Sequence, residues 1–156
     1  MAENIGLEIS KSQELAKMLN ELLGDYQIAY LNCRGYHWNV KGNQFFELHA
    51  KFEEIYTTIQ TQIDEIAERV LTLGYAPVHS YSQYLKSPLK EDLHVTDGRQ
   101  CVEGILNGFT MVIIPRQREI MKFASDAADE GTASLMSDYI RDQEKLAWML
   151  SAYLGK

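Results

Sequence analysis

Long apolar runs, basic segments and cysteine motifs are all scarce in this sequence. No uninterrupted apolar run approaches the ~20 residues that a membrane-spanning helix needs. The opening residues, MAENIGLEIS, contain neither a basic segment nor the apolar core of a signal peptide. Cys33 and Cys101 belong to no C-x-x-C pair, which weighs against a disulfide framework and against a thiolate metal site. The sequence therefore predicts a cytoplasmic protein without a membrane segment, in which both cysteines are small buried residues.

Positive charge is also in deficit. The chain has 15 lysine and arginine residues against 22 acidic residues, and its formal net charge is -7 at pH 7. Such a surface repels polyanions and concentrates cations near the protein, so nucleic acid is a disfavoured partner. A length of 156 residues suits one domain with its own core, and we expect a single domain over residues 1–156.

Four segments carry apolar residues at spacings of three and four, which predicts amphipathic helices. The first should run from about residue 10 to about Val40, with Ser10 or Ser12 as its N-cap. The second should run from Phe45 to a stop at Gly74. The core-facing residues of these two helices are expected to be Leu15, Met18, Leu19, Leu22, Tyr26, Ala29 and Cys33, then Phe45, Leu48, Phe52, Ile55, Ile59, Ile63, Ile66, Val70 and Leu73.

The second half of the chain predicts two more helices. The third should begin near Asp97 and kink at Pro115, because proline removes a backbone donor. The fourth should follow Gly131. Their core-facing residues are expected to be Val102, Ile105, Leu106, Phe109, Ile113, Ile120 and Phe123, then Leu135, Tyr139, Leu146, Leu150 and Tyr153.

The stretch YAPVHSYSQYLKSPLKEDLHV separates the second helix from the third. It is too long for a tight turn and too aromatic for a free linker, so it should cross the bundle and has room for a short helix. The expected fold is all-α, a four-helix bundle with one long crossover.

Polar residues flank the apolar stripe of the second predicted helix. His49, Glu53, Asp64 and Glu68 share a stripe that is turned about 100° from the core positions. His49 and Glu53 are spaced i, i+4, as are Asp64 and Glu68, so each pair projects its two polar groups toward one point. Each pair therefore has the spacing of half a metal site.

The two pairs cannot hold one ion within a chain, because Asp64 lies ~22 Å beyond His49 along the helix. Two copies of the helix, packed antiparallel about a two-fold axis just after Thr58, would bring them together. His49 would then face Glu68 of the partner subunit. Glu53 would likewise face Asp64 of the partner subunit, and the arrangement would occur twice per dimer.

A helical hairpin that turns near Asn43 places a second histidine, His37, opposite His49. The site would then offer two imidazoles and three carboxylates, a set that suits iron, zinc or manganese rather than copper(I) or an iron–sulfur cluster. The alternative is purely structural. Acidic residues at this spacing are usually a solvated helix face, and a histidine before a tryptophan is usually a packed core residue.

The segments HWNVKGNQFFELHAKFEE and IDEIAERVLTLGYAP closely resemble the signature of the Dps family, the mini-ferritins, and the resemblance covers nearly the whole chain. It implies a ferritin-like four-helix bundle with a short helix in the long crossover. It also implies a hollow shell of twelve subunits that oxidises ferrous iron, typically with hydrogen peroxide, and stores the ferric mineral. Such a shell protects the cell from oxidative stress.

The resemblance also implies a di-iron ferroxidase site shared between two subunits. The residues that match the family's ligands are His37, His49 and Glu53 from one subunit, and Asp64 and Glu68 from its two-fold partner. Trp38 matches the family's tryptophan beside the site, where packing is its expected role.

The sequence departs from the family in its termini. Many members bind DNA through a lysine-rich extension that follows the phosphates. Here the opening residues contain Glu3 and Glu8 without any lysine or arginine, and Lys156 closely follows the last predicted helix. We therefore expect no direct DNA binding, and protection through the removal of iron and peroxide.

Acidic residues near the start of the fourth helix match positions that line a three-fold pore in the family. A solvated helix end explains them equally well, because negative charge there suits the helix dipole. They are Asp126, Asp129, Glu130 and Asp138.

Two further sequence features resemble metal-binding residues but do not predict a site. The EDLH motif at residues 91–94 has the E-x-x-H form of di-iron bundles, but it lies beside Pro88 in the crossover and has no second copy. His79 has no ligand-spaced companion and should be a surface or packing residue. The alternative functions are a DNA-binding nucleoid protein with little ferroxidase activity and a zinc or manganese hydrolase, for which the sequence offers no H-E-x-x-H motif.

Overall fold

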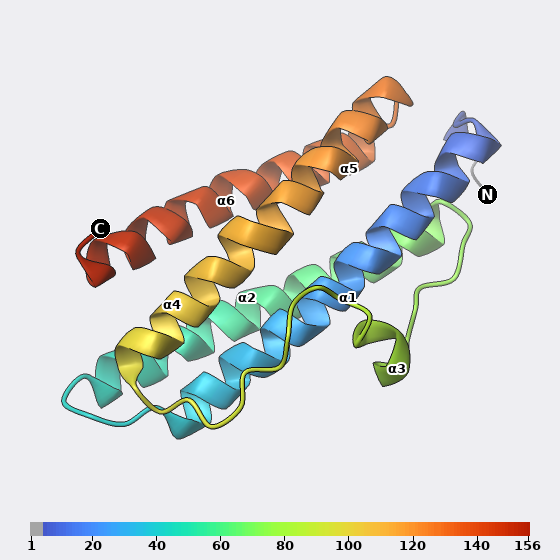
Figure 1. The fold of residues 1–156 in the computed structure, drawn as a ribbon. Coiled ribbons are helices and arrows are strands. Elements are labelled where there is room, and N and C mark those ends of the chain that lie inside the picture. The colour runs from blue at the N-terminus through green and yellow to red at the C-terminus, as the bar shows by residue number, and fades with distance from the viewer. Residues whose placement is uncertain (1–4) are drawn as a thin grey trace.

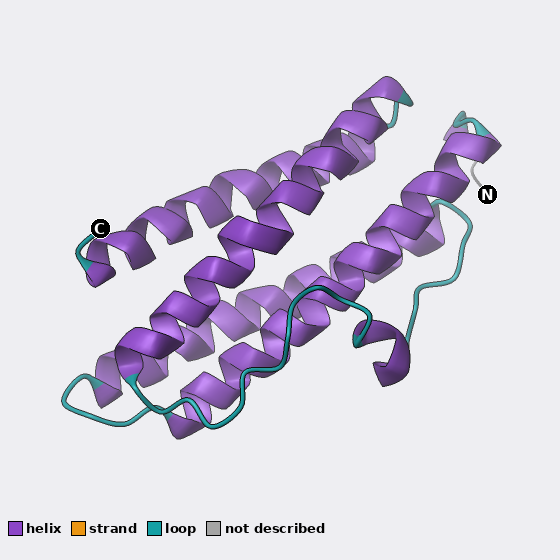
Figure 2. Ribbon diagram, viewed as in Figure 1, coloured by secondary structure: helices purple, strands orange, loops and turns teal. Residues whose placement is uncertain are grey.

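Four long helical rods and one short helix form the structure, a computed structural model that describes residues 5–156 (Figure 1, Figure 2). The rods are α1 (Ile9–Asn39), α2 (Phe45–Thr72), the continuous run of α4 (Gly98–Gly108), η2 (Phe109–Ile113) and α5 (Ile114–Asp126), and α6 (Glu130–Leu154). The short helix α3 (Tyr81–Tyr84) lies in the crossover between α2 and α4. The predicted all-α four-helix bundle with a short helix in its crossover is confirmed. Glu3 and the rest of the first four residues of the expected domain lie outside the described residues.

The rods are arranged as two hairpins. α1 packs along α2, α5 packs along α6, and the crossover passes over α1 on its way to α4 (Figure 1). Both cysteines are buried and unpaired, as predicted. Across residues 5–156, no helix combines the length and the apolar character required to span a membrane.

The capping residues differ partly from the prediction. Asp97 caps α4 as expected, since its side chain accepts a hydrogen bond from the backbone N–H of Gln100 at 2.9 Å. At α1 the N-cap is Glu8, which makes no side-chain cap, so the predicted serine caps are wrong. Ser10 and Ser12 lie inside the helix instead.

The start of α6 also lies earlier than predicted. The helix begins at Glu130 rather than after Gly131. Asp129 is its N-cap, and its carboxylate accepts a hydrogen bond from the backbone N–H of Thr132 at 2.9 Å. An aspartate at this position satisfies a backbone donor that has no partner within the helix, and this explains why the glycine does not mark the boundary.

Where a kink at Pro115 was predicted, the rod has a π-helical turn just before the proline. The turn is η2, which directly precedes α5, and Pro115 lies in the first turn of α5. A π turn shifts the hydrogen bonding by one residue and accommodates a proline without a donor. The rod continues beyond it to Asp126 (Figure 1).

The last turn of α6 buries a different residue from the one predicted. Leu154 is 3% exposed, whereas Tyr153, the predicted core residue, is 37% exposed. Leu154 lies one turn after the buried Leu150, so it continues the same helix face. The hydroxyl of Tyr153 instead donates to the side chain of Gln44 before α2.

A closed ring of three hydrogen bonds lies in the middle of the bundle. Tyr26 donates to Gln117 at 2.6 Å, Gln117 donates to Gln143 at 2.7 Å, and Gln143 donates back to Tyr26 at 2.6 Å. All three residues are buried and come from α1, α5 and α6. No buried side-chain polar atom within residues 5–156 lacks a partner. The interior of the bundle is therefore closed by neutral groups that satisfy one another.

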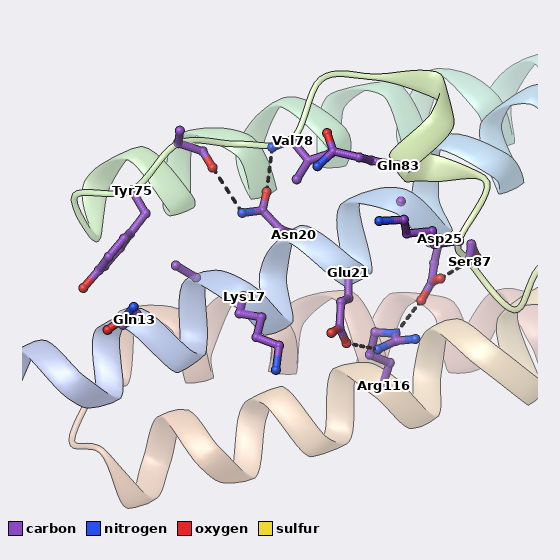
Figure 3. A pocket seen from close by; sticks show the side chains of 14 residues that line it. Gln13, Lys17, Asn20, Glu21, Asp25, Tyr75, Val78, Gln83, Ser87 and Arg116 are labelled. Carbon is purple, nitrogen blue, oxygen red and sulfur yellow. Dashed lines mark hydrogen bonds and ion pairs between the residues drawn. The ribbon is translucent and has the colours of Figure 1, made fainter.

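A buried ion pair ties the crossover and α5 to α1. Asp25 is fully buried and accepts hydrogen bonds from Arg116 and from the Ser87 hydroxyl, both at 2.5 Å (Figure 3). Arg116 also pairs with Glu21 at 2.7 Å. The backbone N–H of Val78, in the crossover, donates a hydrogen bond to the Asn20 side-chain oxygen at 2.8 Å. A cavity of about 710 Å³ lies beside this network.

Arg116 compensates the buried carboxylate of Asp25. Burial raises the pKa of Asp25, and the hydrogen bond from Ser87 and the charge of Arg116 act against that shift. We expect Arg116→Leu to lower the free energy of unfolding by ~3–5 kcal/mol, because it strands a buried charge. Adding Asp25→Asn should recover part of the loss, since the amide carries no charge. Denaturant titration followed by circular dichroism measures both changes.

The matched control is Arg118→Leu. Arg118 pairs with Glu144, and both side chains are more than half exposed, at 52% and 53%. Loss of such a surface pair should cost only ~0–1 kcal/mol. Equal losses in the Arg116 and Arg118 variants would show that the buried pair has no special role in stability.

Candidate metal centre

The hairpin between α1 and α2 brings His37 and His49 together, as the sequence predicted. The connection occupies residues 40–44 and includes Gly42 at φ +117°, a conformation that favours glycine. The backbone N–H of Lys41 donates to the carbonyl of Thr96 at 2.9 Å, which fixes the loop to the segment before α4. The two histidines therefore come from neighbouring helices at the closed end of a hairpin.

The two imidazoles hold each other in place through their backbones. The Nδ1 of His37 lies 2.6 Å from the carbonyl oxygen of His49, and the Nδ1 of His49 lies 2.8 Å from the carbonyl oxygen of His37. The rings are stacked, with centroids 3.8 Å apart and planes within 16°. A carbonyl can only accept, so each Nδ1 must carry the proton. In the neutral rings, both Nε2 atoms then keep the lone pair that binds a metal.

Aromatic residues enclose this pair of rings. Tyr56 meets His37 edge to face at a centroid distance of 5.3 Å, and Phe45 stacks on His49 at 4.9 Å. Neither residue was among the predicted site residues. Their signal was their position on α2, because Phe45 precedes His49 by one turn and Tyr56 follows it by two turns.

Trp38, whose expected role is packing beside the site, lies at the surface of the single chain. Its side chain is 60% exposed, and the guanidinium of Arg34 sits 4.6 Å from its ring centroid. Arg34 also lies 5.1 Å from the ring centroid of Tyr30. Trp38 therefore packs against one charged side chain and leaves most of its surface to solvent.

The three carboxylates lie along the exposed side of α2. Glu53, Asp64 and Glu68 are all exposed, and none of them forms an ion pair with another residue of the 5–156 range. The single chain does not bring all five predicted ligands together. No group of three or more histidine, cysteine or acidic side chains suited to a metal forms within the described part of one chain. Assembly of the full set by two subunits stays a prediction.

The acidic residues near the start of α6 divide into two kinds. Asp129 is 2% exposed and pairs with Arg69 at 2.6 Å, so its suggested role in a pore is wrong. Its carboxylate is used by the helix cap and by the arginine. The remaining candidates are exposed, and two of them pair with basic neighbours; they are Asp126, Glu130 and Asp138.

The two remaining histidines, His79 and His94, both lie outside the helices. His94, in the EDLH motif, has a φ of 63° and lies outside every helix, which agrees with the rejection of that motif. His79 is exposed in the crossover, as expected.

Comparison with known proteins agrees with this fold. Residues 16–156 match the family model for the ferritin-like domain. The chain is 56% identical to a Dps protein of known crystal structure from Vibrio cholerae O1, with a TM-score of 0.94 over 96% of this chain and 94% of that one. It is 39% identical to the DNA protection during starvation protein of Porphyromonas gingivalis, over 99% of this chain and 97% of that protein. A Dps crystal structure from Bacillus brevis is 33% identical, with a TM-score of 0.89 over 95% and 99% of the two chains.

These matches define the chain as a ferritin-like protein. Within that superfamily it belongs to the Dps family, the mini-ferritins.

The protonation of the paired histidines provides a test that needs no iron. At alkaline pH we expect neutron diffraction to show deuterium on Nδ1 and none on Nε2 in both His37 and His49. The backbone carbonyls hold these protons in place. His94, which is exposed, serves as the comparison residue. Deuterium on Nε2 of either paired histidine would contradict the assignment of that nitrogen as a metal donor.

Proposed function

We propose that this chain is a ferroxidase and an iron-storage mini-ferritin. The observation that carries the proposal is the reciprocal hydrogen bonding of His37 and His49 through their Nδ1 atoms. This leaves the lone pairs of both Nε2 atoms free to bind a metal. A carboxylate one turn from His49, that of Glu53, adds oxygen to the same side of the helix. Asp64 and Glu68 supply a second pair of oxygen donors further along α2.

The donor set suits the oxidation of ferrous iron. Carboxylates favour the ferric product more than imidazoles do, and a mixed set binds both oxidation states. Two ferrous ions held together can give one electron each to one molecule of hydrogen peroxide, which takes up two protons and leaves as two molecules of water. The paired transfer avoids release of hydroxyl radical. The proposal therefore names ferrous iron as the substrate and hydrogen peroxide as the preferred oxidant.

The proposed site is shared between two subunits. His37, His49 and Glu53 of one chain would face Asp64 and Glu68 of the partner subunit, because the two halves are too far apart on one α2. Two such sites would form per two-fold dimer, and six dimers would build a twelve-subunit shell in the cytoplasm that holds the ferric mineral. Residues 1–156 would form one domain of that shell.

This chain would protect DNA by removing iron and peroxide rather than by binding the DNA. The net charge of -7 opposes direct binding to a polyanion, because such binding depends largely on basic side chains that neutralise phosphates. The P. gingivalis relative is named for DNA protection during starvation. Removal of iron and peroxide would protect DNA without a complex.

Subunit exchange tests the shared site directly. We expect His49→Ala and Asp64→Ala each to slow ferrous oxidation greatly while the helical circular dichroism stays unchanged, since both residues lie off the core. Mixing the two variants under exchange conditions should restore activity. In a mixed dimer one site is fully wild type and the other carries both lesions. With random pairing, the recovered rate should approach roughly a quarter of the wild-type rate.

Two controls show whether recovered activity comes from mixed dimers. Each variant subjected to exchange with itself should stay inactive, and mass spectrometry should show that the mixed sample has formed heterodimers. A site contained within one chain cannot be rescued by mixing. Exchanged subunits that remain as inactive as their parents would therefore reject the shared site.

A further inference from the structure

A cavity of about 710 Å³ lies between α1, the crossover and α5, and the proposed function gives it no role (Figure 3). Its volume falls within the range of ~300–1,000 Å³ that is typical of small-molecule sites. The part of α1 that lines it ends at Asp25, and His37 lies ~18 Å further along the helix. The cavity is therefore separate from the candidate metal centre. We call it the crossover cavity.

The walls of the crossover cavity hold more positive than negative charge. Three basic side chains line it, those of Lys17, Lys86 and Arg116, against the two acidic side chains of Glu21 and Asp25. The whole chain, by contrast, has a formal net charge of -7. A local surplus of basic groups in an acidic protein favours an anion over a cation at this place.

The acidic side chains of the cavity are already engaged. Asp25 is fully buried and accepts hydrogen bonds from the Nε of Arg116 and from the Ser87 hydroxyl, both at 2.5 Å. Glu21 accepts from the Nη1 of Arg116 at 2.7 Å. These two carboxylates fix the plane of the guanidinium, while its Nη2 bonds to no other group of residues 5–156. A fixed guanidinium edge with unused donors suits the oxygens of a carboxylate or a phosphate.

Lys86 adds a second cation at the same end of the cavity. It directly precedes Ser87, which bonds Asp25 and so lies beside Arg116. Lys86 forms no ion pair with any residue of the 5–156 range. The opposite end is less polar, because Ala16 and the ring of Tyr75 line it (Figure 3). The crossover cavity therefore has a basic end and a mainly apolar end.

The crossover wall of the cavity is held to α1 at both ends. The Asn20 side chain donates to the carbonyl of Ala76 at 3.1 Å and accepts from the backbone N–H of Val78 at 2.8 Å. Ser87 bonds Asp25 at the other end. Between these points lies α3, which buries none of its side chains. The cavity is thus formed before any ligand arrives, as small-molecule sites usually are.

We propose that the crossover cavity is a binding site for a small organic oxyanion, a molecule with a carboxylate or phosphate head and an apolar body. The head lies against Arg116 and Lys86, and the body lies against Ala16 and Tyr75. Binding does not involve the metal centre, so the site stands or falls independently of the ferroxidase function.

Ligand-observed NMR on the chelator-treated full chain tests the class of ligand. The probes share one aromatic ring: phenyl phosphate, benzoate, neutral benzyl alcohol and cationic benzylamine. We expect both anions to bind roughly tenfold or more tightly than the other two, because hydrogen bonds to charged groups are the stronger ones. The ratio of the two anion affinities distinguishes a phosphate head from a carboxylate head. Absence of binding by both anions, or equal binding of all four probes, would overturn the proposal.

Lys86→Gln tests the basic end of the cavity. We expect it to weaken the binding of phenyl phosphate roughly tenfold, through loss of a charged hydrogen bond. The matched control is Lys145→Gln, at an exposed lysine of α6 that does not line the cavity. It removes the same charge and should leave the affinity unchanged. An equal effect of the two variants would mean that the anion responds only to net charge, and would reject the site.

Asn20→Leu tests the crossover wall, because it removes both hydrogen bonds of that side chain. Asn32 provides the matched control, since it bonds the crossover in the same way outside the cavity, to the carbonyl of Lys90 and the backbone N–H of Asp92, both at 2.9 Å. We expect Asn20→Leu to weaken phenyl phosphate binding several-fold and Asn32→Leu to leave it unchanged, with the helical circular dichroism retained in both. Wild-type binding by Asn20→Leu, or an equal loss in both variants, would place the anion outside this cavity.

Discussion

The reciprocal hydrogen bonds between His37 and His49 are the constraint on which the candidate centre depends. They join the end of α1 to the start of α2, and they fix the ring orientation and the tautomer of both imidazoles. Each ring donates its Nδ1 proton to the backbone of the other residue, so neither ring can turn without breaking its hydrogen bond. The free Nε2 atoms are a consequence of the hairpin rather than of any metal.

The remainder of the bundle supports this hairpin, and the buried side-chain polar atoms among residues 5–156 all have partners. The ring formed by Tyr26, Gln117 and Gln143 fills the centre with neutral groups that satisfy one another. The deeply buried carboxylate of Asp25 is held by Arg116 and Ser87. The carboxylates of Glu53, Asp64 and Glu68 are exposed instead along the outer face of α2, and none of the three forms an ion pair among residues 5–156. A second subunit that covers this face would complete the centre.

Helical periodicity made most of the fold predictable, because burial repeats every three to four residues in each rod. The errors lie at helix ends and in single side chains. Asp129 caps α6 and binds Arg69, an interaction with a distant helix that a local pattern does not show. Leu154 rather than Tyr153 continues the buried face, and the sequence pattern did not separate these neighbours. The π turn before Pro115 depends on how the backbone shifts its hydrogen bonds.

The apposition of the histidines followed from hairpin symmetry, whereas their tautomer required the carbonyl positions. The predicted pairing of α2 ligands from two subunits is not visible in a single chain. It rests on the symmetric spacing of those ligands along α2.

The central claim is that one metal centre takes donors from two chains. Anomalous diffraction from crystals soaked with iron or zinc tests it most directly, because it locates the metal without reference to activity. The account predicts two peaks per two-fold dimer, each beside the Nε2 atoms of His37 and His49 of one chain and beside Asp64 and Glu68 of the partner subunit. A metal peak bound wholly by residues of one chain, or crystals with metal elsewhere and none at these histidines, would contradict it.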